Sequence, residues 1–471
     1  MKRMEGDGKA MTENKMGTLP INKLILSMSL PMMISMVIQS LYNIVDSMFV
    51  AQLGEEALTA VSLAFPIQNL MIAVMVGTGV GMNALLSRNL GEKKFVEANK
   101  TALNGVFLAV VHYILFLVLS LTIVRPFFLA QTSDPEIVRS GISYLSIVMA
   151  FSLGQFFQVT YERLLQSTGR TIYSMWTQGL GAVINIVLDP ILIFGWFGLP
   201  RMGVAGAAWA TVIGQGVAAG LAMYLNAKKN PDLQMDFRGF RPQKSIIREI
   251  YSVGVPSIVM TSISSVTTFS LNMILIQFSS TATAVFGVYY KLQSFVFMPV
   301  FGLTNGIIPI LSYNYGAKKK QRILEAMKLS IIYAMGVMLM GLVIFQVFPV
   351  QLLSLFNASS EMMAIGVPAI RTISLCFVLA GFNILASTIY QAFGKGMLSL
   401  SVSVTRQLVV LVPLAYLFSL TGNIQAVWWS YPAAELVATA LCVYFIRMLH
   451  KRVISQLPEE LNVEMPVTIK K

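Results

Sequence analysis

Two short stretches, far apart in the chain, carry the same pattern. Residues 87–94 read Ser-Arg-Asn-Leu-Gly-Glu-Lys-Lys, and residues 312–319 read Ser-Tyr-Asn-Tyr-Gly-Ala-Lys-Lys. The two stretches superimpose without a gap when Ser87 is placed on Ser312, an alignment that we call the repeat register. Because serine, asparagine, glycine and two lysines recur in this register, the match predicts that the chain consists of two related halves.

The repeat extends outward on both sides of these stretches. The repeat register also pairs Pro31 with Pro256, Gln68 with Gln293, Gly77 with Gly302, Gly81 with Gly306, Gln166 with Gln391, Gly169 with Gly394 and Ser174 with Ser399. Near the end of each half, Trp209 pairs with Trp429 and Tyr224 with Tyr444, in a register that is shorter by five positions. The second half therefore contains a shortened loop.

The composition indicates a membrane protein. Of the 471 residues, 56% are hydrophobic and 12% are charged, whereas soluble domains have about 45–50% apolar and about 25% charged residues. These values exclude a disordered chain, a secreted disulfide scaffold and an ordinary cytosolic enzyme. A membrane-spanning helix needs roughly 20 apolar residues, so the chain is long enough for about a dozen spans.

Twelve long apolar segments follow one another, six in each half. They cover residues 24–50, 57–86, 101–124, 140–161, 171–197, 203–226, 250–278, 282–311, 326–349, 367–394, 397–421 and 424–448. We therefore expect an all-α polytopic membrane protein with twelve helices in two six-helix lobes. Because six is even, both halves insert in the same sense, as parallel repeats around a central cleft.

The charges predict how the chain is divided and oriented. We expect an N-terminal tail over 1–23, an N-lobe over 24–226, a linker over 227–249, a C-lobe over 250–448 and a C-terminal tail over 449–471. Lysine and arginine gather in the tails, the linker and the loops after the second, fourth and eighth helices. The positive-inside rule then places both termini in the cytoplasm, with the protein in the cell membrane. The net charge of +13 is accounted for in this way, so no nucleic-acid partner is expected.

Other classes of chemistry are not indicated. Cys376 and Cys442 lie in apolar runs and are expected to pack without reacting. His112 and His450 are too far apart in the sequence for a zinc motif. The chain has no phosphate-binding loop, so we expect neither an enzyme nor an ATP-driven pump, and no cofactor beyond a coupling ion. The polar segment 1–19 predicts no removable signal peptide.

Acidic residues within apolar segments are the main functional candidates, since burying a charge in the membrane is costly. These residues are Asp46, Glu162, Asp189 and Glu435. The alternatives stay open: each aspartate could make a hydrogen bond that packs helices. Glu162 could form a surface ion pair with the adjacent arginine, and Glu435 could pair with Arg406 or Arg371.

Asp189 stands in a local pattern that suits a cation. Asn185 lies four residues earlier, on the same face of the expected helix. Pro190 removes the usual donor to the carbonyl of Ile186. A carboxylate, an amide oxygen and a freed carbonyl together suit a proton or a hard cation.

The acidic residues are not duplicated by the repeat. The two registers place Asp46, Asn185, Asp189 and Thr211 over Leu271, Val410, Leu414 and Tyr431. None of these four can supply a carboxylate or an amide. Ion coupling is therefore predicted to be local to the N-lobe.

Several motifs carry a resemblance to a known family. They are Asn43-Ile-Val-Asp46, Gln52-Leu-Gly54, Pro66-Ile-Gln68, Ser87-Arg-Asn-Leu-Gly91, the segment from Asn185 to Pro190, and Gly206-Ala-Ala-Trp-Ala-Thr211. With them the chain resembles the multidrug and toxic compound extrusion (MATE) transporters. It is most similar to the branch of bacterial multidrug exporters and DNA-damage-inducible transporters.

The resemblance implies an N-lobe site for H⁺ or Na⁺ at Asp46, Asn185, Asp189 and Thr211. Gln39 and Tyr42 would line the same cavity. Further cavity candidates are Asn43 and Glu162, together with Met33, Met36, Phe156 and Met260, whose flexible apolar side chains suit varied ligands. A second family branch keeps acids in the seventh and tenth helices, whereas this chain has none over 250–278 or 373–393.

The expected function is secondary active multidrug efflux. The transporter would act as a monomer in the lipid bilayer and export amphipathic, cationic drugs in exchange for H⁺ or Na⁺ by alternating access. A lipid-linked oligosaccharide flippase is the alternative, for which a basic cavity would be expected. A membrane enzyme would need a clustered acidic or histidine motif, and a receptor would not explain the repeat. The lysine-rich loops at 87–94 and 312–319 could be gates, or helix ends capped by Gly91 and Gly316.

Overall fold

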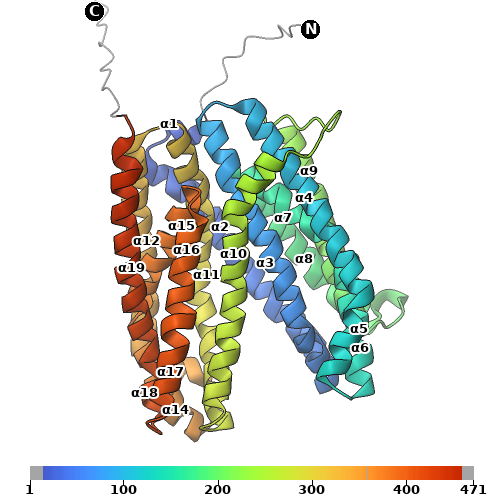
Figure 1. Cartoon of the computed structure of the whole chain (residues 1–471). Helices are drawn as coiled ribbons and strands as arrows, with labels where there is room; N and C mark the ends of the chain where they lie inside the picture. The colour runs from blue at the N-terminus through green and yellow to red at the C-terminus, as the bar shows by residue number, and fades with distance from the viewer. Residues whose placement is uncertain (1–13, 357, 459–471) are drawn as a thin grey trace, which may run out of the picture.

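A computed structural model describes residues 14–356 and 358–458, which are helical throughout with short connections (Figure 1). The long helices of the first half are α2 (Ile21–Ala51), α3 (Glu55–Gly91), α4 (Phe95–Thr122), α6 (Pro135–Ala150), α7 (Leu153–Ser167), α8 (Thr171–Phe194) and α9 (Val204–Lys229). Shorter helices are α1 (Lys15–Thr18) and α5 (Val124–Gln131). A 3₁₀ turn covers Trp196–Gly198.

The second half repeats this order. Its helices are α10 (Lys244–Leu275), α11 (Ser280–Gly316), α12 (Lys320–Val347), α13 (Pro349–Ser354), α14 (Ser360–Ser374), α15 (Phe377–Ala392), α16 (Gly396–Val404), α17 (Val412–Ser419), α18 (Ile424–Trp428) and α19 (Ser430–Arg452). A π-helical segment, Thr405–Leu411, joins α16 to α17, and a 3₁₀ turn covers Ile454–Gln456.

The predicted twelve spans are confirmed, with a difference in two of them. Ten of the described helices or helix runs are long and apolar enough to cross a membrane, and two bent pairs bring the number to twelve. The pairs are α6 with α7, bent by 46°, and α14 with α15, bent by 50°. The hydropathy pattern predicts one helix at each place. At the breaks, the Ser152 hydroxyl and the Cys376 thiol donate to carbonyls three residues back, a local bond that competes with the helical ladder.

The two halves meet through glycines that the repeat relates to one another. Helix α3 packs against α10, and α11 packs against α2. A Cβ atom at Gly77 would lie 2.8 Å from the backbone nitrogen of Ile258, and one at Gly302 would lie 2.6 Å from that of Met33. The repeat register pairs Gly77 with Gly302 and Met33 with Ile258, so the two contacts are equivalent. The repeat in the sequence therefore corresponds to a repeated contact between the lobes.

The loops after α3 and α11 differ from the expectation that glycine caps these helices. The residues with left-handed backbone are Lys93 (φ 58°) and Lys318 (φ 59°). Gly91 instead lies against the other lobe, where a Cβ atom would be 2.0 Å from the carbonyl oxygen of Tyr313. Gly316 makes the related contact, 2.1 Å from the carbonyl oxygen of Arg88. These glycines are required for close approach of two backbones.

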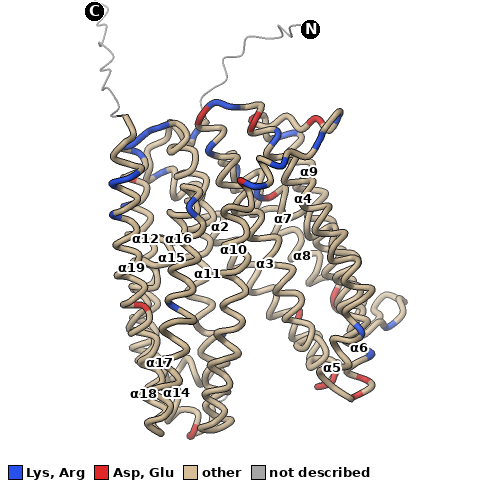
Figure 2. The backbone as a smooth tube through the Cα atoms, in the orientation of Figure 1, with Lys and Arg blue, Asp and Glu red and all other residues tan. Residues whose placement is uncertain are grey.

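The lobes come together at one end of the bundle and diverge toward the other (Figure 1). Helix α1, where the described residues begin, and the C-terminal end of α19 both lie at the end where the lobes meet. Lysine and arginine gather at this same end, whereas few lie in the middle of the helices (Figure 2). By the positive-inside rule, this distribution of charge predicts that the termini lie in the cytoplasm.

Packing of the two lobes against each other should depend on Gly81, because a Cβ atom there would lie 2.0 Å from the carbonyl oxygen of Ile250. We expect Gly81→Leu to destabilise the protein by about 3 kcal/mol, the upper end of the usual cost of overpacking. The measurement is the midpoint of thermal unfolding in detergent. Gly336→Leu is the matched control, since nothing lies within 4 Å of a Cβ atom there. Equal midpoints for the two variants would contradict the prediction.

Candidate functional site

Two carboxyl groups from different helices meet inside the N-lobe. Asp46 on α2 and Asp189 on α8 lie within hydrogen-bonding reach of each other. Oδ1 of each group is buried and has no hydrogen-bond partner among the described residues. An ionised carboxylate only accepts hydrogen bonds, so a direct hydrogen bond between the two groups would need a proton on one of them.

Asn185 and Thr211 complete the polar group around Asp189. The Asn185 amide nitrogen donates to Asp189 Oδ2 over 3.3 Å, and its amide oxygen accepts from the Thr211 hydroxyl over 3.2 Å. Asn185 and Asp189 are one turn apart on α8, and Pro190 follows in the same helix. Thr211 comes from the neighbouring helix α9. The structure thus brings the four predicted coupling residues into one cluster of oxygen atoms.

A ring of further polar side chains adjoins this cluster. The Tyr42 and Tyr144 hydroxyl groups lie within electrostatic reach of both carboxyl groups. The Gln68 amide nitrogen donates to the Tyr144 hydroxyl over 3.2 Å. Tyr42 is one of the residues predicted for this cavity, whereas no site role is predicted for Tyr144 or Gln68. Nothing in the sequence separates Tyr144 from the other tyrosines, because only the packing of α6 brings it to α2 and α8.

The remaining predicted cavity residues are scattered. Gln39 and Asn43 are exposed on α2, and Met33, Met36 and Met260 are half-buried. Gln391 contacts the Met260 sulfur at 3.9 Å. Phe156 is 1% exposed and packs between the rings of His112 and Phe116. This places Phe156 in the core of the N-lobe.

Glu162 lies in a buried network that is separate from the aspartate pair. Its Oε1 accepts from the Thr177 hydroxyl over 2.7 Å and from the Gln158 amide over 3.1 Å, and its Oε2 accepts from the Gln178 amide over 2.9 Å. Gln178 in turn accepts a hydrogen bond from Ser35 on α2. Glu162 is 3% exposed, so the alternative of a surface ion pair is wrong.

Arg163, the neighbour of Glu162, points to other partners. Its guanidinium donates to Gln166 over 2.9 Å and to Asn305 on α11 over 2.8 Å. The second of these bonds joins the two lobes. Adjacent acidic and basic residues in the sequence thus serve different contacts, which the sequence alone does not reveal.

Glu435 is paired in the C-lobe, as one of the open alternatives predicts. Its carboxylate accepts from Arg406 over 2.8 Å and from Asn383 over 2.6 Å. Arg406 comes from the π-helical segment between α16 and α17. The pairing satisfies this buried charge with two donors, which is a sufficient structural role for the residue.

A comparison with protein families matches both halves of the chain. The MatE family matches residues 31–191 and 256–417. The multidrug export protein MepA of Staphylococcus haemolyticus is 25% identical over 433 residues, covering 92% of this chain and 94% of that protein. An FAD transporter of Shewanella oneidensis is 25% identical over 439 residues, covering 91% of this chain and 95% of that protein.

Solved structures agree with the family match. A multidrug resistance MATE family transporter of the MOP superfamily, in an outward-facing conformation, is similar with a TM-score of 0.88 and 28% identity, over 95% of this chain and 99% of that chain. A MOP superfamily transporter from Pyrococcus furiosus is similar with a TM-score of 0.84 and 28% identity, over the same shares. Because the family match spans more than half of the chain and falls in both repeats, the chain belongs to the MatE family.

Proposed function

We propose that this protein is a secondary active multidrug efflux antiporter that exports amphipathic, cationic compounds in exchange for H⁺ or Na⁺. The observation that carries the proposal is the close approach of Asp46 and Asp189 inside an apolar lobe. Acidic groups within membrane helices mark ion pathways. The MepA relative is named as a multidrug export protein, which supports drugs as the exported class.

The cluster offers two ways to bind a coupling ion. One proton shared by the carboxyl pair removes the repulsion between two negative charges. With both groups ionised, the carboxylate, amide and hydroxyl oxygens of Asp46, Asp189, Asn185 and Thr211 form a ligand set suited to a hard cation such as Na⁺. In both cases the ion draws α2 toward α8 and α9.

Helix α2 provides the link from this site to the other lobe. Asp46 lies toward one end of α2, whereas Ser29 and Met33 lie toward the other and pack against Gly306 and Gly302 of α11. A cation that changes the position of α2 therefore changes the inter-lobe contact. A ligand shifts a conformational equilibrium only by its difference in affinity for the two states, and this connection supplies such a difference.

We propose that residues 24–226 and 250–448 form the two lobes and rock about the glycine contacts, with the linker 227–249 between them. The protein would act as a monomer in the cell membrane with both termini in the cytoplasm. The end where the lobes meet would then face the cytoplasm, and the diverging end would face outward.

The FAD transporter relative and the flippase alternative suggest two other substrates, FAD and a lipid-linked oligosaccharide. FAD and lipid-linked oligosaccharides carry phosphate groups, which need basic partners. The aspartate cluster contains two carboxyl groups and no basic side chain among its described members. This charge favours a cationic substrate for the present chain.

Asp46→Asn and Asp189→Asn should each abolish ion-driven efflux, because an amide cannot take part in proton exchange or balance Na⁺ with a negative charge. The measurement is ethidium efflux from vesicles under an imposed proton or sodium gradient. Glu361→Gln, an exposed acid in the C-lobe, is the matched control and should retain efflux. Wild-type rates in both aspartate variants would refute a coupling role for the pair.

Thr211→Val should distinguish the two coupling ions, since it removes one oxygen ligand at nearly constant volume. Losing a buried polar contact costs about 1–3 kcal/mol, so we expect sodium-driven efflux to need about tenfold more Na⁺. Proton-driven efflux should stay close to the wild-type rate. A loss of proton-driven efflux alone would show that Thr211 holds the carboxyl pair in place.

Glu435→Gln should lower stability and leave the ion response intact. The change removes the charge that pairs with Arg406, at a cost of about 1–3 kcal/mol. The measurements are thermal unfolding and ion-stimulated release of a pre-bound dye from the purified protein, compared with Asp189→Asn. If Glu435→Gln loses the ion response and Asp189→Asn keeps it, the coupling site lies in the C-lobe.

A further inference from the structure

A pocket of about 350 Å³ lies between the lobes near the end where they meet. Helix α3 forms its N-lobe wall, through residues that include Gly81 and Arg88. Helices α10 and α11 and the turn between α15 and α16 form the C-lobe wall, through residues that include Glu249, Tyr315 and Lys395. The volume is within the usual range for small-molecule sites. The mechanism proposed above does not use this pocket.

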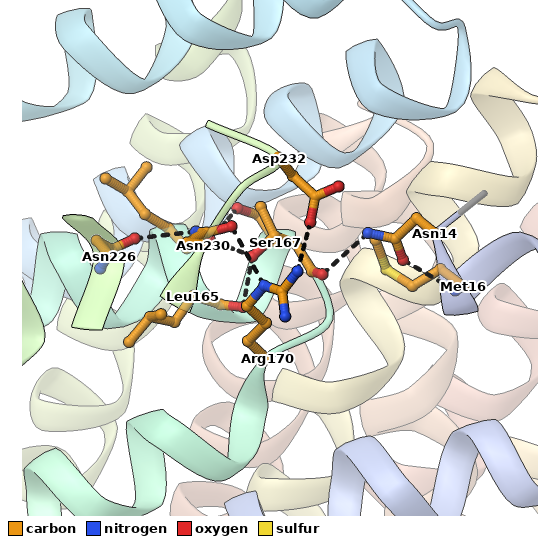
Figure 3. Close-up of polar contacts among 10 residues, drawn as sticks. Asn14, Met16, Leu165, Ser167, Arg170, Asn226, Asn230 and Asp232 are labelled. Carbon is orange, nitrogen blue, oxygen red and sulfur yellow. Dashed lines mark hydrogen bonds and ion pairs between the residues drawn. The ribbon is translucent and has the colours of Figure 1, made fainter. Parts of the chain in front are cut away.

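The repeat relates this pocket to a second groove on the other side of the lobe junction. The repeat register places the turn Phe393–Lys395 on Thr168–Arg170. In that second groove α1 fills the space, and Met16 is fully buried there. The Asn14 amide donates to the Thr168 carbonyl over 3.1 Å (Figure 3). The chain's own segment α1 thus occupies the positions that correspond to the pocket, and we call this place the twin groove.

The segment α1 is held through its carbonyl oxygens, which contact donors of the C-lobe. The Met16 carbonyl accepts from Asn314 and from Arg322, each over 3.0 Å. The Gly17 carbonyl accepts from Lys319 over 2.8 Å, and the Leu19 carbonyl accepts from Arg322 over 2.8 Å. One occupant therefore bridges both lobes by offering acceptors to basic and amide groups.

The chain fills the twin groove and not the pocket, because the linker takes another path. In the repeat register, α1 falls on Phe240–Gln243, the part of the linker just before α10. There the Gln243 backbone N–H donates to Asn104 on α4 over 2.9 Å, and the Phe240 ring packs 6.2 Å from that of Phe107. The linker is tied to the N-lobe, and the groove beside Lys395 stays open as the pocket.

The pocket presents donors that the protein does not use. The Nη2 atom of Arg88 donates to Glu249 over 2.8 Å. Its Nε is buried without a hydrogen-bond partner among the described residues, with Glu92 at 3.7 Å. Lys395 is exposed, and its ammonium group has no hydrogen bond or ion pair with a described residue. The rings of Tyr315 and Phe393 lie 4.8 Å apart and form an apolar wall.

We propose that this pocket binds a small anionic group, a phosphate or a carboxylate, between Arg88 of the N-lobe and Lys395 of the C-lobe. Glu249 sits at the rim, 54% exposed, and orients the Arg88 guanidinium.

Such a ligand would regulate the lobe equilibrium. Both walls belong to the site only while the lobes meet, so the anion binds that state and not the one in which they part. A ligand with this preference shifts the population toward the closed junction. The bound anion would thus bridge the two lobes, as α1 does in the twin groove.

The test measures the distance between spin labels at Lys229→Cys and Lys451→Cys, which are exposed residues at the ends of α9 and α19. The protein is the full chain with Cys376→Ala and Cys442→Ala. The probes are inorganic phosphate added in neutral detergent at constant ionic strength, and nanodiscs of phosphatidylcholine with or without phosphatidylglycerol. Arg88→Gln and Lys395→Gln remove the proposed contacts. Lys228→Gln removes a charge at the same end of the bundle and is the matched control.

We expect the anion to raise the ratio of short to long distances about fivefold, the lower end of typical coupling between sites. Arg88→Gln and Lys395→Gln should lose this response, and Lys228→Gln should keep it. A response to phosphate identifies a soluble anion, and a response only to phosphatidylglycerol identifies a lipid headgroup. No response to any probe, or an equal response in Lys395→Gln, would overturn the proposal. The inference rests on the proposed rocking of the lobes, but the test involves no transport step, so its outcome does not depend on the coupling ion or on the exported substrate.

Discussion

Close contact between two backbones at glycine is the constraint on which the whole arrangement depends. Gly91 and Gly316 each lie so near a carbonyl of the other lobe that no side chain fits between them. Lipid tails are as apolar as the helices, so hydrophobicity alone does not hold two membrane lobes together. Small residues solve this problem, since they let helices approach to a distance at which packing and weak polar contacts become favourable.

A related glycine contact connects the aspartate cluster to the other lobe. Helix α2 carries Asp46 toward one end and packs on α11 near the other, around Met33 and Gly302. The carboxyl pair belongs to one lobe only, because the repeat places leucines at both corresponding positions. Under the proposed mechanism, a symmetric scaffold with an asymmetric site would let one lobe respond to an ion while the other provides the opposing surface.

The symmetry is also broken at the end where the lobes meet. On one side α1 lies across the junction, held by Thr168 of the N-lobe and by Asn314, Lys319 and Arg322 of the C-lobe. On the other side the linker is tied to α4 and leaves a pocket with unused donors. The two related places thus differ, because the segments that precede the two halves have different partners.

The number of spans, the repeat and the residue types of the aspartate cluster could be predicted from the sequence. Hydropathy and the register of Gly77, Gly302 and their neighbours are local properties, so they can be read along one chain. The positions of Asn185 and Asp189 on one helix face follow from helical periodicity, whereas grouping them with Asp46 and Thr211 came from the family resemblance. The tertiary structure alone decided that Tyr144 joins this cluster, that Glu162 does not, that Gly91 serves packing and not a cap, and that α1 fills one of two related grooves. These outcomes depend on distances between helices, which are set by packing of whole helices across the two lobes and leave no mark on the local pattern of residues.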